Sequence, residues 1–170
     1  MKPLKNPDLH HLRAAEGWLE LGDHIEANQE LENISPKLRS HPSVLEIRWQ
    51  IYANDNKWEA CVDIACSLVK LAPKRSESWI HRSFALHALH RTQEAFDNLL
   101  PAAHKFSDVW QIPYNLACYC SVLGRFDEAA NWFKKAILID DKTVQRAGID
   151  DPDLKPLWDS MSTTIWKKEE

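Results

Sequence analysis

The chain has 170 residues, a length typical of one domain, and 44% of its residues are hydrophobic, which is enough for a core. The formal net charge is −4 with acidic and basic residues mixed throughout, so the chain lacks the basic stripe with which nucleic-acid-binding proteins neutralise phosphates. No apolar run approaches membrane-spanning length and the N-terminus lacks the apolar segment of a signal peptide, so we expect a cytoplasmic protein with neither nucleic-acid nor membrane partners.

Proline positions and helical periodicity predict the elements in chain order. Residues 1–7 contain two prolines and are expected to form a disordered lead. Four helical hairpins are then predicted at about 8–40, 41–75, 76–109 and 110–141. Their helices are expected at about 8–21 and 24–35, 43–54 and 57–71, 76–89 and 92–105, and 111–123 and 126–139.

After Asp141 the pattern ends, and residues 142–170 are expected to form a connecting segment and a capping helix at 154–167. The apolar stripe of that helix would cover the last hairpin and consists of Leu154, Leu157, Trp158, Met161 and Ile165. The last four residues, Lys167–Glu170, are expected to be a solvated end.

A turn followed by Glu-Ala occurs four times in the sequence. It reads LGDHIEA at 21–27, NDNKWEA at 54–60, LHRTQEA at 89–95 and LGRFDEA at 123–129. The closing alanines are Ala27, Ala60, Ala95 and Ala129, spaced by 33, 35 and 34 residues. A period near 34 with a small residue where two helices cross is typical of stacked helical hairpins.

This pattern resembles the tetratricopeptide repeat (TPR) family over residues 8–141. The last repeat carries the resemblance best, at Leu116, Ala117, Gly124, Ala129, Phe133 and Ala136. The second repeat is the weakest, because it keeps Ala60 and Ile64 but has Asp55 at the position of the turn glycine. The resemblance implies an all-α fold, a right-handed α-solenoid of four TPR-like hairpins with a C-terminal capping helix.

The resemblance also implies a binding surface. In TPR proteins a stripe on the first helix of each hairpin lines a concave groove. In the four hairpins of this chain, taken in order, the stripe would consist of Leu9, Leu12, Glu16 and Leu19; Pro42, Leu45, Trp49 and Tyr52; Glu77, Ile80, Phe84 and His87; and Gln111, Tyr114, Cys118 and Ser121. The expected partner-binding residues are Leu12, Leu45, Trp49, Tyr52, Ile80, Phe84, His87, Tyr114, Asn115 and Cys118. Two alternatives stay open: some of these pack between hairpins, or another part of the chain fills the groove.

One kind of ligand is disfavoured by the charges on this stripe. TPR domains that bind the acidic C-terminus of heat-shock chaperones use a clamp of lysine, asparagine and arginine. The corresponding places here hold Leu12, Glu16, Glu46, Glu77 and His81. Because the three glutamates would repel a carboxylate, the sequence does not predict that ligand.

No catalytic signature occurs in the sequence: the four glycines are widely spread, and neither a Gly-x-Ser-x-Gly elbow nor a His-Glu-x-x-His motif is present. Cys118 and Cys120 point in different directions on one helix, and Cys61 and Cys66 share a face poorly. We therefore expect no disulfide, no catalytic residue, no metal site and no cofactor. His87, His90 and Cys118 leave a metal site open as an alternative.

These observations favour a non-enzymatic adaptor that binds an apolar or aromatic peptide or helix of another protein in its groove. The alternatives are a small cytoplasmic secretion-type chaperone for an apolar segment of an exported protein, and a metal-binding or regulatory subunit of an enzyme. Formation of a homo-oligomer is also possible. The Asp-Pro-Asp-Leu ending at 151–154 is similar to the ending of many bacterial TPR proteins, so a bacterial origin is expected.

Overall fold

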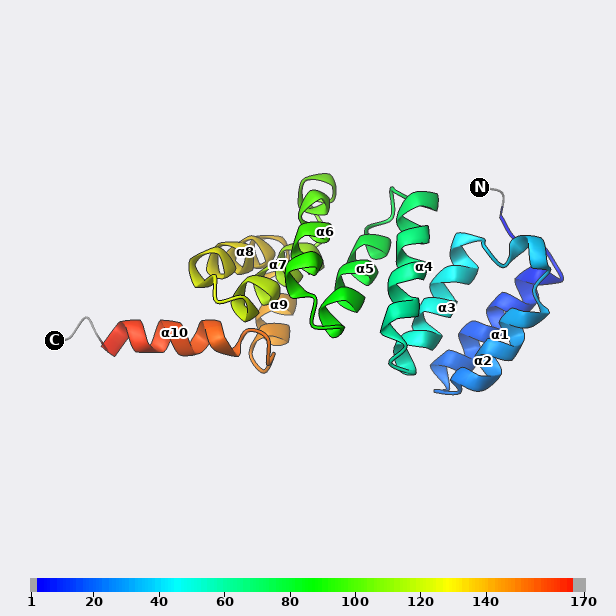
Figure 1. Cartoon of the computed structure of the whole chain (residues 1–170), viewed down its shortest axis with the longest axis horizontal. Helices are drawn as coiled ribbons and strands as arrows, with labels where there is room; N and C mark the ends of the chain where they lie inside the picture. The colour runs from blue at the N-terminus through cyan, green and yellow to red at the C-terminus, as the bar shows by residue number, and fades with distance from the viewer. Residues whose placement is uncertain (1–2, 167–170) are drawn as a thin grey trace. The chain divides into compact units, whose positions relative to one another are not determined.

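The structure is a computed structural model that describes residues 3–166, with side chains as far as Met161. The described residues form only helices: α1 (Asp8–Glu20), α2 (His24–Asn33), the 3-10 helix η1 (Pro36–Leu38), α3 (Pro42–Asn54), α4 (Trp58–Leu71), α5 (Ser76–Ala88), α6 (Thr92–Lys105), α7 (Gln111–Val122), α8 (Phe126–Ile139), α9 (Asp141–Gly148) and α10 (Lys155–Trp166) (Figure 1). The predicted helices are confirmed to within two residues at each end. Among the described helices, none has both the length and the apolar character needed to cross a bilayer.

The four hairpin turns share one backbone geometry. Each places one residue in the left-handed region, and these residues are Gly22 (φ 80°), Asn56 (φ 55°), His90 (φ 60°) and Gly124 (φ 73°), each 34 residues after the one before. The next residue donates its backbone N–H to a carbonyl five residues back, as Asp23 does to Trp18 at 2.9 Å and Arg125 does to Cys120 at 2.8 Å. This is the bond that closes a helix in the Schellman motif, so the repeat has a strict period of 34.

That period shifts the second repeat by one residue from the sequence-based assignment. The crossing positions are Ala27, Cys61, Ala95 and Ala129, all completely buried. The prediction of Ala60 is therefore wrong, since Ala60 is only half-buried and its neighbour Cys61 takes the position. For the same reason Asn56, not Asp55, occupies the turn, and Ala65 replaces Ile64 as the apolar residue one turn later. Asn tolerates the left-handed conformation better than most residues, which explains a turn without glycine.

The chain divides into two compact units, Met1–Ser78 and Trp79–Glu170. In the first unit α1 packs against α2 and α3, and α3 against α4. Leu4, a residue of the expected disordered lead, is buried in this core with an exposure of 8%. Asp8 accepts the backbone N–H of Ser35 at 2.6 Å, which ties the start of α1 to the end of α2 and lowers the pKa of the Asp8 carboxyl.

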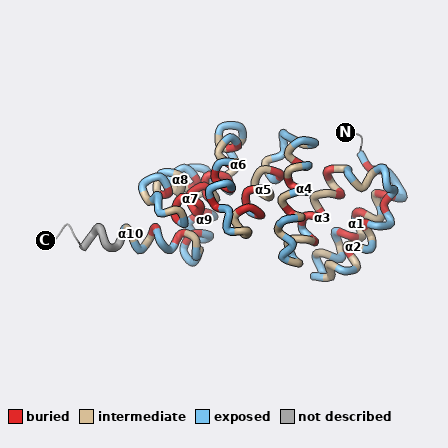
Figure 2. The backbone as a smooth tube through the Cα atoms, viewed as in Figure 1, coloured by how far each residue is buried: buried red, intermediate tan, exposed pale blue. Residues whose placement is uncertain are grey.

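Helix α7 is the centre of the second unit. Nine of its 12 residues are buried, which makes it the most enclosed helix of this unit (Figure 2). It packs against α6 and α8, and α10 contacts both α7 and α8. Pro101 lies inside α6, which continues through it.

The end of the second unit contains a helix where the sequence predicts only a connecting segment. Asp140 begins α9 by accepting the backbone N–H of Thr143 at 3.2 Å. At the other end a Cβ on Gly148 would lie 2.9 Å from the Phe133 ring, so only glycine fits this contact between α9 and α8. The Trp158 indole N–H of α10 donates to the Gly148 carbonyl at 3.2 Å.

Among the α10 side chains that the structure describes, burial falls along the helix. Leu154 and Leu157 are buried, whereas Met161 is 49% exposed. The Ile165 side chain and residues 167–170, which complete the tail expected from sequence, lie outside the described part. The covering of the last hairpin thus combines α9, which the sequence did not predict, with the predicted helix α10.

Candidate partner-binding surface

The strict period of 34 defines equivalent positions on the first helix of every hairpin. We call this set the first-helix stripe: Leu12, Glu16 and Leu19 on α1; Glu46, Gln50 and Ala53 on α3; Ile80, Phe84 and His87 on α5; and Tyr114, Cys118 and Ser121 on α7. The stripe expected from sequence is in register on α1, α5 and α7. On α3 it is wrong by one residue, because the crossing position of that repeat is Cys61 and not Ala60.

The three expected binding residues of α3 consequently lie beside the stripe. Leu45 is half-buried, and Tyr52 packs against the core of the first unit with the Lys57 ammonium 5.4 Å from its ring centre. Trp49 is only 7% exposed. On α1, Leu12 is part of the core with an exposure of 5%. These side chains therefore offer little exposed surface, with Trp49 contributing through the groove described next.

An open groove of about 520 Å³ lies in the first unit between α1 and α3. Its lining combines buried or half-buried apolar residues with exposed polar ones: Leu19, Ile47, Trp49 and Ala53 in the first group, and Glu16, Glu20, Gln50 and Asn54 in the second. Four of these eight residues belong to the first-helix stripe. The groove therefore has an apolar floor with carboxylates and amides at its edge.

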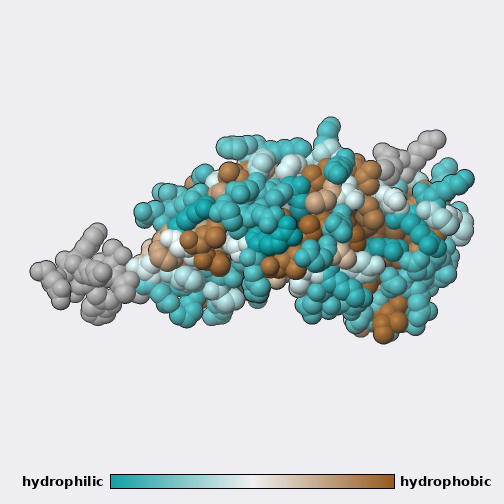
Figure 3. Space-filling model, viewed as in Figure 1, coloured by the Kyte–Doolittle hydropathy of each residue, from teal (hydrophilic) through white to brown (hydrophobic). Residues whose placement is uncertain are grey.

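Other apolar atoms on the visible face of this unit form separate patches, one of them at the α1–α2 turn (Figure 3). Leu21 and Ile25 are exposed at that turn, with 77% and 64% of their surface accessible. Neither residue lines the open groove, which offers a partner a hollowed surface and is the better candidate for binding.

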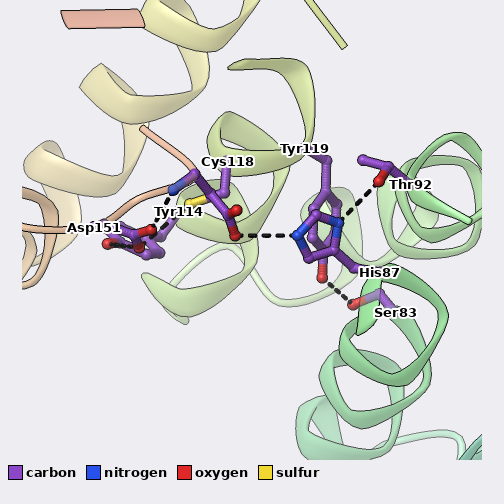
Figure 4. Close-up of polar contacts among 8 residues, drawn as sticks. Ser83, His87, Thr92, Tyr114, Cys118, Tyr119 and Asp151 are labelled. Atoms are coloured by element: carbon purple, nitrogen blue, oxygen red, sulfur yellow. Dashed lines mark hydrogen bonds and ion pairs between the residues drawn. The ribbon is translucent and has the colours of Figure 1, made fainter. Parts of the chain in front are cut away.

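In the second unit the α7 part of the stripe is filled by the chain itself. The Tyr114 hydroxyl donates to the Asp151 carboxylate at 2.5 Å, and the Cys118 thiol donates to the same oxygen at 3.8 Å (Figure 4). Ser121 Oγ accepts the backbone N–H of Leu157 at 3.2 Å. The segment Asp151–Leu157, a turn leading into α10, thus contacts all three α7 positions of the stripe, which agrees with the alternative that another part of the chain fills the groove.

His87 joins the same network from α5. Its Nε2 lies 3.1 Å from the Asp153 carboxylate and its Nδ1 lies 3.0 Å from the Thr92 hydroxyl. The imidazole also packs on the Tyr119 ring at 4.9 Å between centres, and the Tyr119 hydroxyl donates to Ser83 at 3.2 Å (Figure 4). His87 is therefore positioned by contacts within the unit, in addition to being half-buried.

Burial raises the pKa of the Tyr114 phenol and of the Cys118 thiol well above their ordinary ranges, and the Asp151 carboxylate acts in the same direction. Both groups are protonated at neutral pH and serve as hydrogen-bond donors to Asp151. Burial also raises the pKa of Cys61 to about 11 and that of Cys120 to about 12. Since the thiolate is the reactive form, these thiols are poor nucleophiles.

The remaining expected residues differ in exposure. Phe84 is 46% exposed, whereas Ile80 and Asn115 are half-buried. Sequence reasoning omitted Gln50, Ala53 and Glu20 from the groove, and it missed Asp151 and Asp153 as occupants of the stripe. Within the described part of the chain no three His, Cys, Asp or Glu residues lie close enough to hold a metal ion.

Comparison with known proteins supports the fold. No family model matches the sequence, and no curated protein matches it. Among solved structures, TTC0263, a thermophilic TPR protein in Thermus thermophilus, is 18% identical with a TM-score of 0.72 over 91% of this chain and 82% of its own. The crystal structure of a MamA protein is 15% identical with a TM-score of 0.73 over 94% and 88%.

MamA 41-end from Desulfovibrio magneticus RS-1 is 13% identical with a TM-score of 0.72 over 98% of both chains. Identities this low establish similarity of architecture. Together with the turns of period 34 and the buried crossing residues, they show that the chain has the all-α, helical-hairpin solenoid fold of TPR proteins.

Proposed function

We propose that this chain is a non-enzymatic protein–protein interaction adaptor that binds a peptide segment of a partner along the first-helix stripe of its first unit. One observation carries the proposal. In the second unit the stripe residues Tyr114, Cys118 and Ser121 already hold a peptide segment, Asp151–Leu157, through direct hydrogen bonds. In the first unit the equivalents of Cys118 and Ser121 line an open groove instead: Glu16, Leu19, Gln50 and Ala53.

The open groove suits an apolar side chain of a partner. Leu19 and Ala53 are half-buried stripe residues, and Ile47 and Trp49 complete the apolar lining. Burial of one large apolar side chain there contributes about 1.5–3 kcal/mol of binding free energy before the cost of association is subtracted. Several such contacts along a segment are needed for specific binding.

The chemistry of the described residues supports binding over catalysis. The buried thiols have raised pKa values, and the polar network around Asp151 is internally satisfied. Nothing in the described residues favours the alternatives of a secretion-type chaperone or a regulatory enzyme subunit. Action in a bacterial cytoplasm stays a prediction, to which the four free cysteines of the structure are suited.

Filling the groove tests the proposal. Phage-displayed random nonapeptides are selected on the full-length protein, and the affinity of the recovered peptides is measured by fluorescence anisotropy. Ala53→Gln places a larger neutral side chain in the groove, and at least tenfold weaker binding is expected. Ala60→Gln, the same change at a half-buried residue of α4, is the matched control.

Circular dichroism must show that both variants are as helical as the parent. Unchanged affinity in Ala53→Gln, or equal loss in Ala60→Gln, would place binding elsewhere. Failure to recover any binding peptide would contradict the adaptor function itself.

A further inference from the structure

The open groove has a charge pattern that specifies its ligand. On the basis of the proposed function, we infer that it selects partner segments in which an apolar residue is flanked by lysine or arginine. The apolar floor receives the apolar residue, and the carboxylates at the edge receive the cations. This goes beyond a general preference for apolar segments, because it predicts the residues on both sides of the anchor.

Glu16 and Glu20 supply the negative charge. They lie four residues apart on α1, so they share one face of the helix, and both are exposed at the groove. Among the described residues neither glutamate has an ion pair with a lysine, arginine or histidine. Like charges at this spacing repel each other, so a cation of a partner would relieve the repulsion as well as form a new contact.

The next stripe position on α3 is also acidic but is already paired. Glu46 accepts a hydrogen bond from Arg75 at 2.5 Å, and burial together with the nearby Glu77 raises the pKa of the Glu46 carboxyl. Of the stripe glutamates in the first unit, Glu46 is therefore paired with Arg75, whereas Glu16 lies at the groove without an ion pair among the described residues. Gln50 and Asn54 add amide groups that can bond to the backbone of a bound segment.

The second unit shows the opposite chemistry on its part of the first-helix stripe, where Tyr114 and His87 are equivalent to Leu12 and Leu19 of α1. There the stripe presents donors, chiefly the Tyr114 hydroxyl and the His87 imidazole, and the segment that fills it supplies the carboxylates of Asp151 and Asp153. A stripe of donors thus holds an acidic segment. By the same complementarity a stripe edged by carboxylates holds a segment that carries donors with positive charge.

Selection of peptides on charge variants tests the inference. The random nonapeptide library is selected in parallel on the parent and on the double variant Glu16→Gln with Glu20→Gln. Lysine and arginine should be enriched beside an apolar residue in peptides from the parent and not in those from the variant. Parent-selected peptides should bind the variant at least tenfold more weakly, and their binding to the parent should weaken with salt.

The control is Glu59→Gln with Asp63→Asn, an equal change of charge on exposed residues of α4. It should keep both the enrichment and the affinity. Peptides recovered without lysine or arginine, or an equal loss in the control, would overturn the inference while leaving the adaptor function intact, whereas recovery of no peptide would remove both. Sedimentation provides a further test. If the parent and the control are dimers and the Glu16→Gln, Glu20→Gln variant is a monomer, a second copy of the chain occupies the groove, and the inference would also be overturned.

Discussion

Removal of the Tyr114 hydroxyl is predicted to loosen the C-terminal segment from α7. Tyr114 is 7% exposed and donates to the Asp151 carboxylate at 2.5 Å. A hydrogen bond to a charged group contributes about 1.5–3 kcal/mol to stability, so Tyr114→Phe should lower the free energy of unfolding of the second unit by that amount. The ring contacts with Trp110 and Phe133, at 5.5 and 6.2 Å between centres, are kept, so little of the loss comes from packing.

Tyr119→Phe is the matched control for this prediction. Tyr119 is also buried, but its hydroxyl donates to the neutral Ser83 hydroxyl at the longer distance of 3.2 Å. A neutral bond of this kind contributes about 0.5–1.5 kcal/mol, so the control should be less destabilised. The assay is urea unfolding of the full chain at pH 7, followed by circular dichroism with the slope compared between variants.

A double-mutant cycle with Asp151→Asn should give a coupling free energy of about 1 kcal/mol or more between the two groups. An unchanged urea midpoint in Tyr114→Phe, or a larger loss in Tyr119→Phe, would refute the reasoning that this bond holds the segment on the stripe.

Three further predictions concern the turns, the helix crossing and the buried thiol. His90→Gly should stabilise the protein by roughly 0.5–1 kcal/mol. A non-glycine residue in the left-handed region costs about 1–2 kcal/mol, and the greater chain entropy of glycine in the unfolded state offsets about 0.5–1 kcal/mol of the gain. A lower melting temperature would contradict the turn assignment. Ala129→Leu should overpack α7 against α8 and cost about 1–3 kcal/mol in urea unfolding, and an unchanged midpoint would mean that the repeat register is wrong. Burial raises the folded-state pKa of Cys118, so the thiol of the unfolded chain ionises first as the pH rises above about 8.5. The free energy of unfolding should therefore fall by about 1 kcal/mol for each further pH unit. In Cys118→Ala the free energy of unfolding should fall less steeply with pH, and equal slopes in the two proteins would contradict this prediction.

The fold could be predicted from sequence because each repeat carries local signals. Gly22 and Gly124 mark turns that need a left-handed residue, and the crossing alanines recur near the right interval. The predicted register of the second repeat is wrong by one residue, because Ala60 stands next to Cys61 and both side chains are small enough for the helix crossing. The asparagine at position 56 was the available signal, since Asn is favoured in left-handed turns.

The occupied stripe was harder to predict, because it depends on contacts far apart in sequence. Asp151 is 37 residues from Tyr114, and Asp153 is 66 residues from His87, so no local pattern links them. Burial of Leu4 in the first core is equally non-local. By contrast α9 had local signals, an aspartate that caps its start and a glycine at its end, which the end of the repeat pattern obscured.

Whether a partner segment lies in the open groove is tested most directly by site-specific photocrosslinking. Benzoylphenylalanine is placed at Gln50, in the groove, or at Asp63, an exposed residue of α4. Each protein is irradiated with a peptide selected on the parent, and the crosslinked position is read by mass spectrometry. We expect a crosslink from position 50 that excess unlabelled peptide removes, and none from position 63; a crosslink from position 63 without one from position 50 would contradict binding in the groove.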